Sequence, residues 1–289
     1  MNLSVVIITF NEEANLGRTL ASVQPLVADG KGEVIVVDSG STDRTVEIAK
    51  SFGAKVFVEE WKGYATQKNS AIDKAQGDWI LSLDADEEID SELRTALYEL
   101  LEALDRLSAL GQQEDSHPRS VIDFASGPAA IPPADFAGLW IPRKNEFLGR
   151  WIRHGGFWPD PKLRLFRRGA GSFENRAVHE DIHVEGITRQ IQSGALLHHS
   201  YPTLSDYIGH MNRYSSLAAE MVAARGQIRF SVSNIVLRPL ATFGYNYFFR
   251  LGFLDGREGL LLHLYHAVYV SWKYAKAWEL SRHKTTLSS

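Results

Sequence analysis

Three runs of β-branched and other apolar residues in the first ninety positions constrain the fold most. They are Leu3–Thr9 (LSVVIIT), Glu33–Val37 (EVIVV) and Trp79–Leu83 (WILSL), and polar residues followed by a helical pattern come after each. A continuous apolar run of this kind is typical of a strand that is buried on both faces. Strands that alternate with helices indicate a mainly parallel sheet with right-handed crossovers. We therefore predict an α/β fold with a mainly parallel sheet flanked by helices.

The rest of the chain divides by composition. We expect residues 1–110 to form the α/β half, in which Asp90 caps a long helix. Residues 111–138, rich in Gly, Pro, Ser and Ala, are expected to be an insertion or loop. Short strands are expected over 139–200, completing the same domain, with Lys162–Phe166 alternating like an antiparallel strand. A helical region is expected over 201–289.

Composition excludes several classes of function. The 289 residues include no cysteine, so disulfide scaffolds, cysteine zinc sites and thiol nucleophiles are ruled out. Residues 1–120 carry 22 acidic and 11 basic side chains, whereas the remainder is basic. This asymmetry is consistent with a divalent cation in the first part and an anionic partner in the second.

Polar clusters follow three of the predicted strands directly. They occupy residues 9–12, 38–43 and 84–87. The carboxyl ends of parallel strands lie on one edge of a sheet, where open α/β folds bind ligands. Each cluster alone could be a helix cap, but three at one edge predict a ligand site.

The third cluster narrows the chemistry of that site. Asp84 and Asp86 are two residues apart, which places both carboxylates on one face of extended backbone. Mg²⁺ or Mn²⁺ is typically held by one or two carboxylates together with substrate phosphates. Neither a Gly-x-Gly-x-x-Gly sequence after the first strand nor a P-loop sequence is present. We therefore expect a divalent metal, Mg²⁺ or Mn²⁺, as cofactor.

These segments resemble a known enzyme family. SVVIITFNEEANL, EVIVVDSGSTDRTVEIA and QKNSAIDKAQGDWILSLDADEEI are similar to inverting family 2 glycosyltransferases of the GT-A fold type. WIPRKNEFLGRWIRHGGFWPDPKLRLFRRG, AVHED and RLGFLDGREGLLLHLYHAVYVSWKYAKAWE resemble the bacterial lipopolysaccharide-core β-1,4-glucosyltransferase branch. The resemblance implies a GT-A type nucleotide-sugar-binding fold with a helical C-terminal extension.

The resemblance also implies roles for individual residues. Asp86 would ligate the metal, and Asp84 would contact the ribose or the same metal. Asp38 would accept a hydrogen bond from the nucleotide base, and Lys68, which stands where relatives often have arginine, would face the diphosphate. Three residues at the end of the first strand and in the loop after it would line the nucleotide pocket: Thr9, Asn11 and Glu12.

The resemblance places the general base on a later segment, Val178–Asp181. Glu180 is the first candidate and Asp181 the alternative. The chemistry agrees, because a carboxylate must remove the proton of the acceptor hydroxyl on the face of the sugar opposite the departing diphosphate. An exposed, purely structural charge cluster is the competing interpretation.

The densest basic segment lies among tryptophans, between Trp140 and Arg168. Aromatic faces suit sugar stacking and guanidinium groups suit phosphate or carboxylate, so we expect acceptor contacts from Trp151, Arg153 and Arg164. A basic rim with structural tryptophans is the alternative. His198 and His199 are interpreted as core or loop residues, with a third-ligand role left open.

Aromatic and basic residues mix throughout Ile235–Leu280, as they do in segments that lie in a membrane interface. Ordinary core packing is the competing interpretation.

The sequence thus predicts a metal-dependent inverting glycosyltransferase. The expected donor is a nucleotide-diphosphate sugar, first of all a UDP-sugar, and the expected acceptor an anionic membrane glycolipid such as the lipopolysaccharide inner core. We expect peripheral contact with the cytoplasmic face of the inner membrane and no nucleic-acid partner. The alternatives are transfer to a polyprenyl phosphate or another surface glycan, a sugar nucleotidyltransferase, and a non-catalytic sugar-binding module.

Overall fold

The computed structural model describes residues 2–110, 135–174, 182–226 and 229–286. The chain forms two compact units, each with its own hydrophobic core. Unit 1 consists of Met1–Arg143 and Pro161–His198, and unit 2 of Lys144–Asp160 and His199–Ser289.

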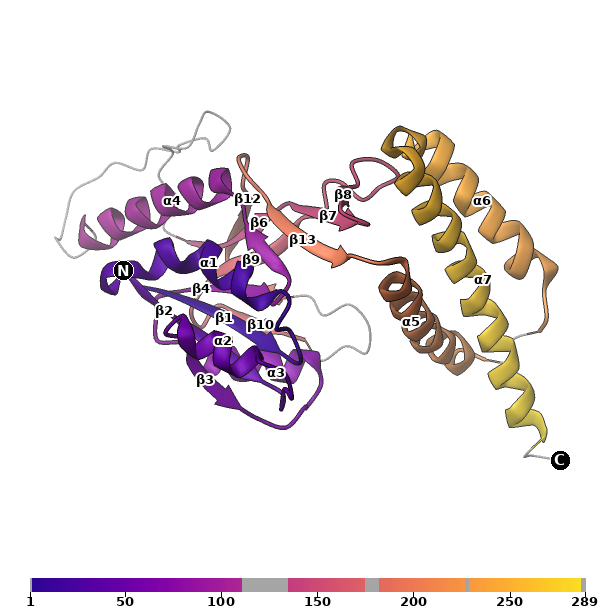
Figure 1. Ribbon diagram of the computed structural model, residues 1–289, viewed down its shortest axis with the longest axis horizontal. Coiled ribbons are helices and arrows are strands. Elements are labelled where there is room, and N and C mark those ends of the chain that lie inside the picture. The colour runs from indigo at the N-terminus through magenta and orange to yellow at the C-terminus, as the bar shows by residue number, and fades with distance from the viewer. Residues whose placement is uncertain (1, 111–134, 175–181, 227–228, 287–289) are drawn as a thin grey trace. The chain divides into compact units, whose positions relative to one another are not determined.

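Unit 1 is built on a seven-stranded sheet (Figure 1). Its strand order is β12-β6-β9-β4-β1-β2-β3. The four strands β4, β1, β2 and β3 are parallel neighbours, whereas β9 runs antiparallel to both β4 and β6. The strands are β1 (Leu3–Thr9), β2 (Gly32–Asp38), β3 (Lys55–Val58), β4 (Trp79–Asp84), β6 (Phe136–Ile141), β9 (Lys162–Arg167) and β12 (Ile187–Gln190).

Helices cover both faces of this sheet because its strands are apolar on both sides. Val5 and Ile7 of β1 belong to a core that also holds leucines of α1 and α4, whereas Val6 belongs to a second core with α3. The helices are α1 (Leu16–Val27), α2 (Thr45–Ser51), α3 (Tyr64–Asp73) and α4 (Ser91–Leu110). The α/β architecture predicted from the three apolar runs is confirmed.

Shorter strands complete unit 1. β5 (Glu87–Ile89) pairs antiparallel with the first half of β13 (Leu196–Tyr201), and β10 (Gly171–Phe173) pairs with β11 (Ile182–Val184). The backbone N–H of Leu93 donates to Asp90 Oδ1 over 2.8 Å, so the predicted cap of α4 is confirmed. Most of the expected insertion, residues 111–134, lies outside the described residues.

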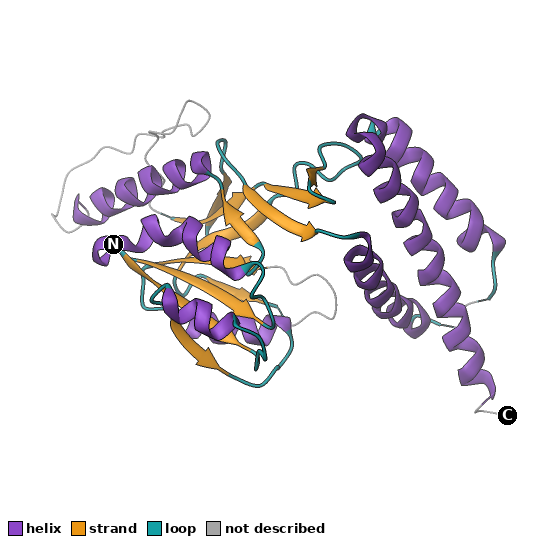
Figure 2. Ribbon diagram, in the orientation of Figure 1, coloured by secondary structure: helices purple, strands orange, loops and turns teal. Residues whose placement is uncertain are grey.

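Unit 2 is mainly helical (Figure 2). Its strands β7 (Arg143–Phe147) and β8 (Arg150–Trp151) pair antiparallel. Its helices are α5 (Leu204–Ala224), α6 (Arg238–Gly244) and α7 (Gly256–Thr286). Wider π-helical turns at Ser233–Leu237 and Tyr245–Phe249 extend α6 at both ends. The helical region expected after residue 200 is therefore observed.

A lysine joins the helices of unit 2. Lys276 Nζ on α7 donates to the carbonyl of Asn212 at 2.8 Å and to the hydroxyls of Ser215 and Ser216 on α5. Burial lowers the pKa of Lys276. No helix in the described part of the chain is long and apolar enough to cross a membrane.

Candidate functional site

The carboxyl ends of β1, β2 and β4 meet at one edge of the unit 1 sheet. In the observed register Thr9 lies opposite Asp38, and Ile8 lies opposite Asp84. Parallel pairing therefore brings the three polar clusters to the same level, as predicted from their positions after the strands.

The loops that follow β1 and β2 are joined by reciprocal hydrogen bonds. The backbone N–H of Asn11 donates to Ser41 Oγ at 2.8 Å, and the N–H of Thr42 donates to Asn11 Oδ1 at 2.9 Å. The N–H of Glu12 donates to Thr45 Oγ1 at 2.8 Å. Asn11 has a φ of 56°, a left-handed conformation that asparagine tolerates better than most residues. Asn11 therefore links the two loops. It is not part of the helix that follows, because α1 begins at Leu16.

Asp38 organises the turn after β2. This fully buried carboxylate accepts hydrogen bonds from the Thr9 hydroxyl at 2.8 Å and from the Ser41 hydroxyl at 2.5 Å. The backbone N–H groups of Gly40 and Ser41 also donate to it. A carboxylate offers about four acceptor positions, so these donors hold it firmly. The hydrogen bond that Asp38 would accept from a nucleotide base stays a prediction.

Asp84 lies in a network of opposite charges at the end of β4. Its Oδ1 is 2.7 Å from Lys68 Nζ and its Oδ2 is 2.6 Å from an Arg164 nitrogen. Burial alone would raise the pKa of Asp84, but Arg164 and Lys68 hold it well below its usual range. Arg164 also contacts the fully buried Glu87 at 2.6 Å, and Arg143 contacts Glu87 at 3.1 Å.

Asp86 pairs with a histidine from a distant strand. His198 Nε2 lies 3.2 Å from Asp86 Oδ2. β13 brings it there because His198 stands opposite Glu87 in the antiparallel pairing with β5. Burial acts to raise the pKa of Asp86, but the hydrogen bond and charge of His198 outweigh it and lower the pKa.

The pKa of Glu12 reflects the negative charge gathered at this edge of the sheet. This pKa is raised, first by burial and then by repulsion from Asp86, Asp43 and Asp84. Four carboxylates thus influence one another here, and a bound cation would relieve that repulsion.

The donor atoms at this edge fit a divalent metal. Asp86 supplies oxygen and His198 nitrogen, a combination suited to Mn²⁺ and related ions. Within the described ranges, no group of three or more His, Asp or Glu side chains forms a complete metal site. A metal bound by this pair would therefore take its remaining ligands from substrate phosphates and water, which is typical of Mg²⁺ in phosphate-binding enzymes.

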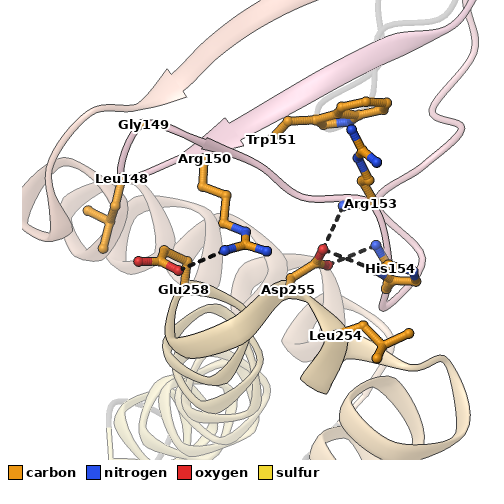
Figure 3. Close-up of a pocket in the computed structure, with 9 residues that line it drawn as sticks. All are labelled: Leu148, Gly149, Arg150, Trp151, Arg153, His154, Leu254, Asp255 and Glu258. Atoms are coloured by element: carbon orange, nitrogen blue, oxygen red, sulfur yellow. Dashed lines mark hydrogen bonds and ion pairs between the residues drawn. The ribbon is translucent and has the colours of Figure 1, made fainter.

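Unit 2 contains a pocket of about 590 Å³ between the β7–β8 region and the start of α7 (Figure 3). Arg150 faces Glu258 across it at 3.6 Å, and the Arg153 guanidinium lies 4.2 Å from the centre of the Trp151 ring. Asp255 accepts hydrogen bonds from the backbone N–H groups of Arg153 and His154, which fixes this loop. The full lining is Leu148, Gly149, Arg150, Trp151, Arg153, His154, Leu254, Asp255 and Glu258.

The sequence-predicted residues divide into three groups. The residues expected around the nucleotide and metal come from the unit 1 edge: Thr9, Asn11, Glu12, Asp38, Lys68, Asp84 and Asp86. Trp151 and Arg153 line the unit 2 pocket, as acceptor contacts could, and that role stays a prediction. Glu180 and Asp181, the candidate bases, lie outside the described residues.

Two placements differ from expectation. Arg164, expected among the acceptor contacts, is 5% exposed and paired with Asp84 and Glu87. Burial between two carboxylates explains this position, because a buried cation requires opposite charges. His198, interpreted mainly as a core or loop residue, lies beside Asp86. Only the position of His198 in a strand near the carboxyl edge of the sheet could have indicated that it lies beside Asp86.

Comparison with known proteins agrees with these features. Residues 4–170 match the model of the family described as glycosyl transferase family 2. A lipopolysaccharide core biosynthesis glycosyltransferase of Rhizobium meliloti, LpsC, is 30% identical over 260 residues, covering 88% of this chain and 82% of that protein. An uncharacterised glycosyltransferase of Rickettsia typhi is 30% identical over 288 residues, covering 96% and 87%.

Among solved structures, a glucosyl-3-phosphoglycerate synthase of Mycobacterium tuberculosis, crystallised with Mn²⁺, UDP and glucosyl-3-phosphoglycerate, matches with a TM-score of 0.34. It is 21% identical, and the match covers 50% of this chain and 44% of that one.

Proposed function

Since the chain belongs to glycosyl transferase family 2, we propose that it is a metal-dependent inverting hexosyltransferase acting on a membrane glycolipid. The proposed donor is a nucleotide-diphosphate sugar, first of all a UDP-sugar. The proposed acceptor is the lipopolysaccharide inner core, at the cytoplasmic face of the inner membrane. The name of the LpsC relative supports the choice of acceptor.

The observation that carries the proposal is the pairing of Asp86 with His198 at the carboxyl edge of the sheet. These two side chains would hold the metal, which would supply positive charge to the departing diphosphate. Lys68, held 2.7 Å from Asp84, places a further cation at the same edge. Thr9, Asn11 and Glu12 belong to the strand end and loop proposed to hold the nucleoside.

Transfer requires one bond to form and one to break. The acceptor oxygen attacks the anomeric carbon from the face opposite the diphosphate, and the bond from that carbon to the diphosphate oxygen breaks with inversion. The hydroxyl proton passes to a carboxylate, for which we propose Glu180, with Asp181 as the alternative. Trp151 and Arg153 are proposed to bind the anionic acceptor, the indole against a sugar face and the guanidinium against a phosphate or carboxylate.

The metal pair can be tested by replacing each member. We expect Asp86→Ala to lower transfer by about a thousandfold or more, because metal stabilisation of developing charge is worth several kcal/mol. His198→Ala should act in the same direction and raise the Mn²⁺ concentration needed for half-maximal turnover. Product formation from UDP-sugars, measured over a Mn²⁺ and Mg²⁺ titration, checks both.

Asp73→Ala is the matched control, because Asp73 is an exposed aspartate of the same unit on α3. Its transfer should match wild type. Thermal unfolding of each variant separates a lost site from a lost fold. Full transfer in excess EDTA would contradict the proposal.

A further inference from the structure

A long acid-free segment leads from α5 to α7 in unit 2. Residues 226–254 contain no Asp or Glu, and their only charged side chains are Arg229, Arg238 and Arg250. Six large apolar or aromatic side chains there are at least 58% exposed, and Phe249 reaches 82%. The six are Val232, Leu237, Leu240, Tyr245, Phe248 and Phe249. So much exposed apolar surface on one short segment marks an interaction site.

The opposite side of this segment packs against α7, so the six exposed side chains face away from that helix. Ser271 Oγ on α7 donates to the carbonyl of Ile235 at 2.9 Å, and Arg238 hydrogen bonds to the Tyr274 hydroxyl. Pro239 is buried. Because α6 and its π-helical extensions already rest against α7, the six exposed side chains stay available to another partner.

The charges indicate what that partner is. All three arginines are exposed, and no carboxylate among the described residues forms an ion pair with any of them. Aromatic and aliphatic groups beside arginines that have no carboxylate partner suit an anionic lipid interface, where apolar side chains enter the acyl boundary and cations meet headgroups. A second copy of the same surface would bring arginines against arginines, which disfavours a symmetric dimer.

We infer that residues 230–254 form a surface that docks on an anionic lipid bilayer. Leu254 belongs to this segment, is 49% exposed, and also lines the unit 2 pocket. The pocket therefore adjoins the proposed docking surface within one unit. This inference rests on the proposed function for the identity of the acceptor, but lipid docking itself can be measured without donor or acceptor.

The test is sedimentation of the full chain with vesicles of phosphatidylcholine, with and without phosphatidylglycerol. We expect binding to the anionic vesicles that salt weakens. Phe248→Ser with Phe249→Ser should reduce the lipid partition coefficient at least about tenfold, since burying each aromatic side chain contributes strongly. Arg229→Gln with Arg238→Gln should reduce it about 25-fold on anionic vesicles only, at about fivefold per arginine.

The matched control is Leu217→Ser with Met221→Ser, two exposed apolar residues of α5 in the same unit. Its vesicle binding should match wild type, and unfolding curves should show that every variant is folded. Equal binding by the phenylalanine variant and wild type would overturn the inference. The inference would also be overturned if the phenylalanine variant lost self-association in sedimentation equilibrium while its vesicle binding stayed intact, because the surface would then join two copies of the chain. Vesicle binding without sugar transfer would count against the proposed function alone.

Discussion

The two units treat polar groups in their interiors differently. At the sheet edge of unit 1, the buried Glu87 and Arg164 belong to a network of opposite charges with Asp84, Lys68 and Arg143. In the core of unit 2, the buried His263 has neither ring nitrogen hydrogen bonded within the described structure. The sheet edge of unit 1 compensates charge with charge, whereas the His263 site of unit 2 leaves a titratable ring without a hydrogen bond.

This difference separates two tasks. A network of ion pairs can exchange one partner for a metal or a diphosphate at little cost, because the charges are already desolvated and oriented. The segment of residues 230–254 in unit 2 instead exposes apolar side chains, which suit contact with a lipid phase. We therefore assign the proposed metal and nucleotide chemistry to unit 1 and the proposed docking to unit 2.

The base substitution should give the largest effect and tests whether the chemistry is confined to unit 1. We expect Glu180→Gln to slow transfer by ~10²–10⁴-fold while nucleotide affinity is kept, the range for a lost general base. Single-turnover transfer and nucleotide titration measure the two quantities. If Asp181→Asn is the damaging change instead, the assignment moves by one residue.

Arg164→Met tests whether unit 1 depends on charge compensation. The substitution leaves Asp84 and Glu87 without their shared partner, and breaking a buried ion pair costs about 3–5 kcal/mol. Urea unfolding should show a loss of that size. Arg168→Met, at the exposed end of the same stretch of chain, serves as the comparison and should cost less. A loss below about 1 kcal/mol for Arg164→Met would mean that the network is not what holds this edge.

His263 gives the smallest effect and tests the apolar interior of unit 2. Burial first, and then the charge of His266, lower the pKa of His263 to about 4, despite the opposing influence of Asp255. The unfolded chain therefore binds a proton that the folded chain does not, so this stability is complete above pH 6.5 and is lost as the pH falls toward about 4.

We expect His263→Phe to remove that part of the pH dependence, so that the melting temperatures of wild type and variant diverge across this window by roughly 2–4 °C for each kcal/mol of stability involved. Thermal unfolding at several pH values measures it. Parallel curves for the two proteins would show that His263 is protonated without penalty.

Much of unit 1 was predictable because parallel strands covered on both faces leave unbroken apolar runs. Leu3–Thr9 corresponds to β1 residue for residue, and the observed register carries Asp38 and Asp84 to the edge where their positions after strands placed them. The expectation that Asp84 and Asp86 share one face of extended backbone was wrong, because β4 ends at Asp84 and Asp86 lies in the turn that follows. The two carboxylates also have different partners, Lys68 and Arg164 for Asp84 and His198 for Asp86.

Arg164 and His198 were harder for a physical reason. In Lys162–Phe166 the charged and apolar residues alternate, which predicts that Arg164 faces solvent, yet the sheet is covered on both faces and Arg164 is buried. His198 reaches Asp86 through the pairing of β13 with β5, and nothing in the local sequence specifies which distant strand will be the partner. Which side of α6 is exposed likewise depends on how α6 packs against α7.

The hydrogen bonds between Asn11 and the Ser41–Thr42 pair have a consequence for the proposed nucleotide pocket. Ordering a loop costs roughly 1–2 kcal/mol of backbone entropy per residue, and here most of that cost is met during folding rather than on nucleotide arrival. The loops after β1 and β2 therefore depend on each other and are expected to change together in evolution. Altering one loop alone would leave the other without its partners, so a new nucleotide preference would evolve most readily through paired substitutions in both.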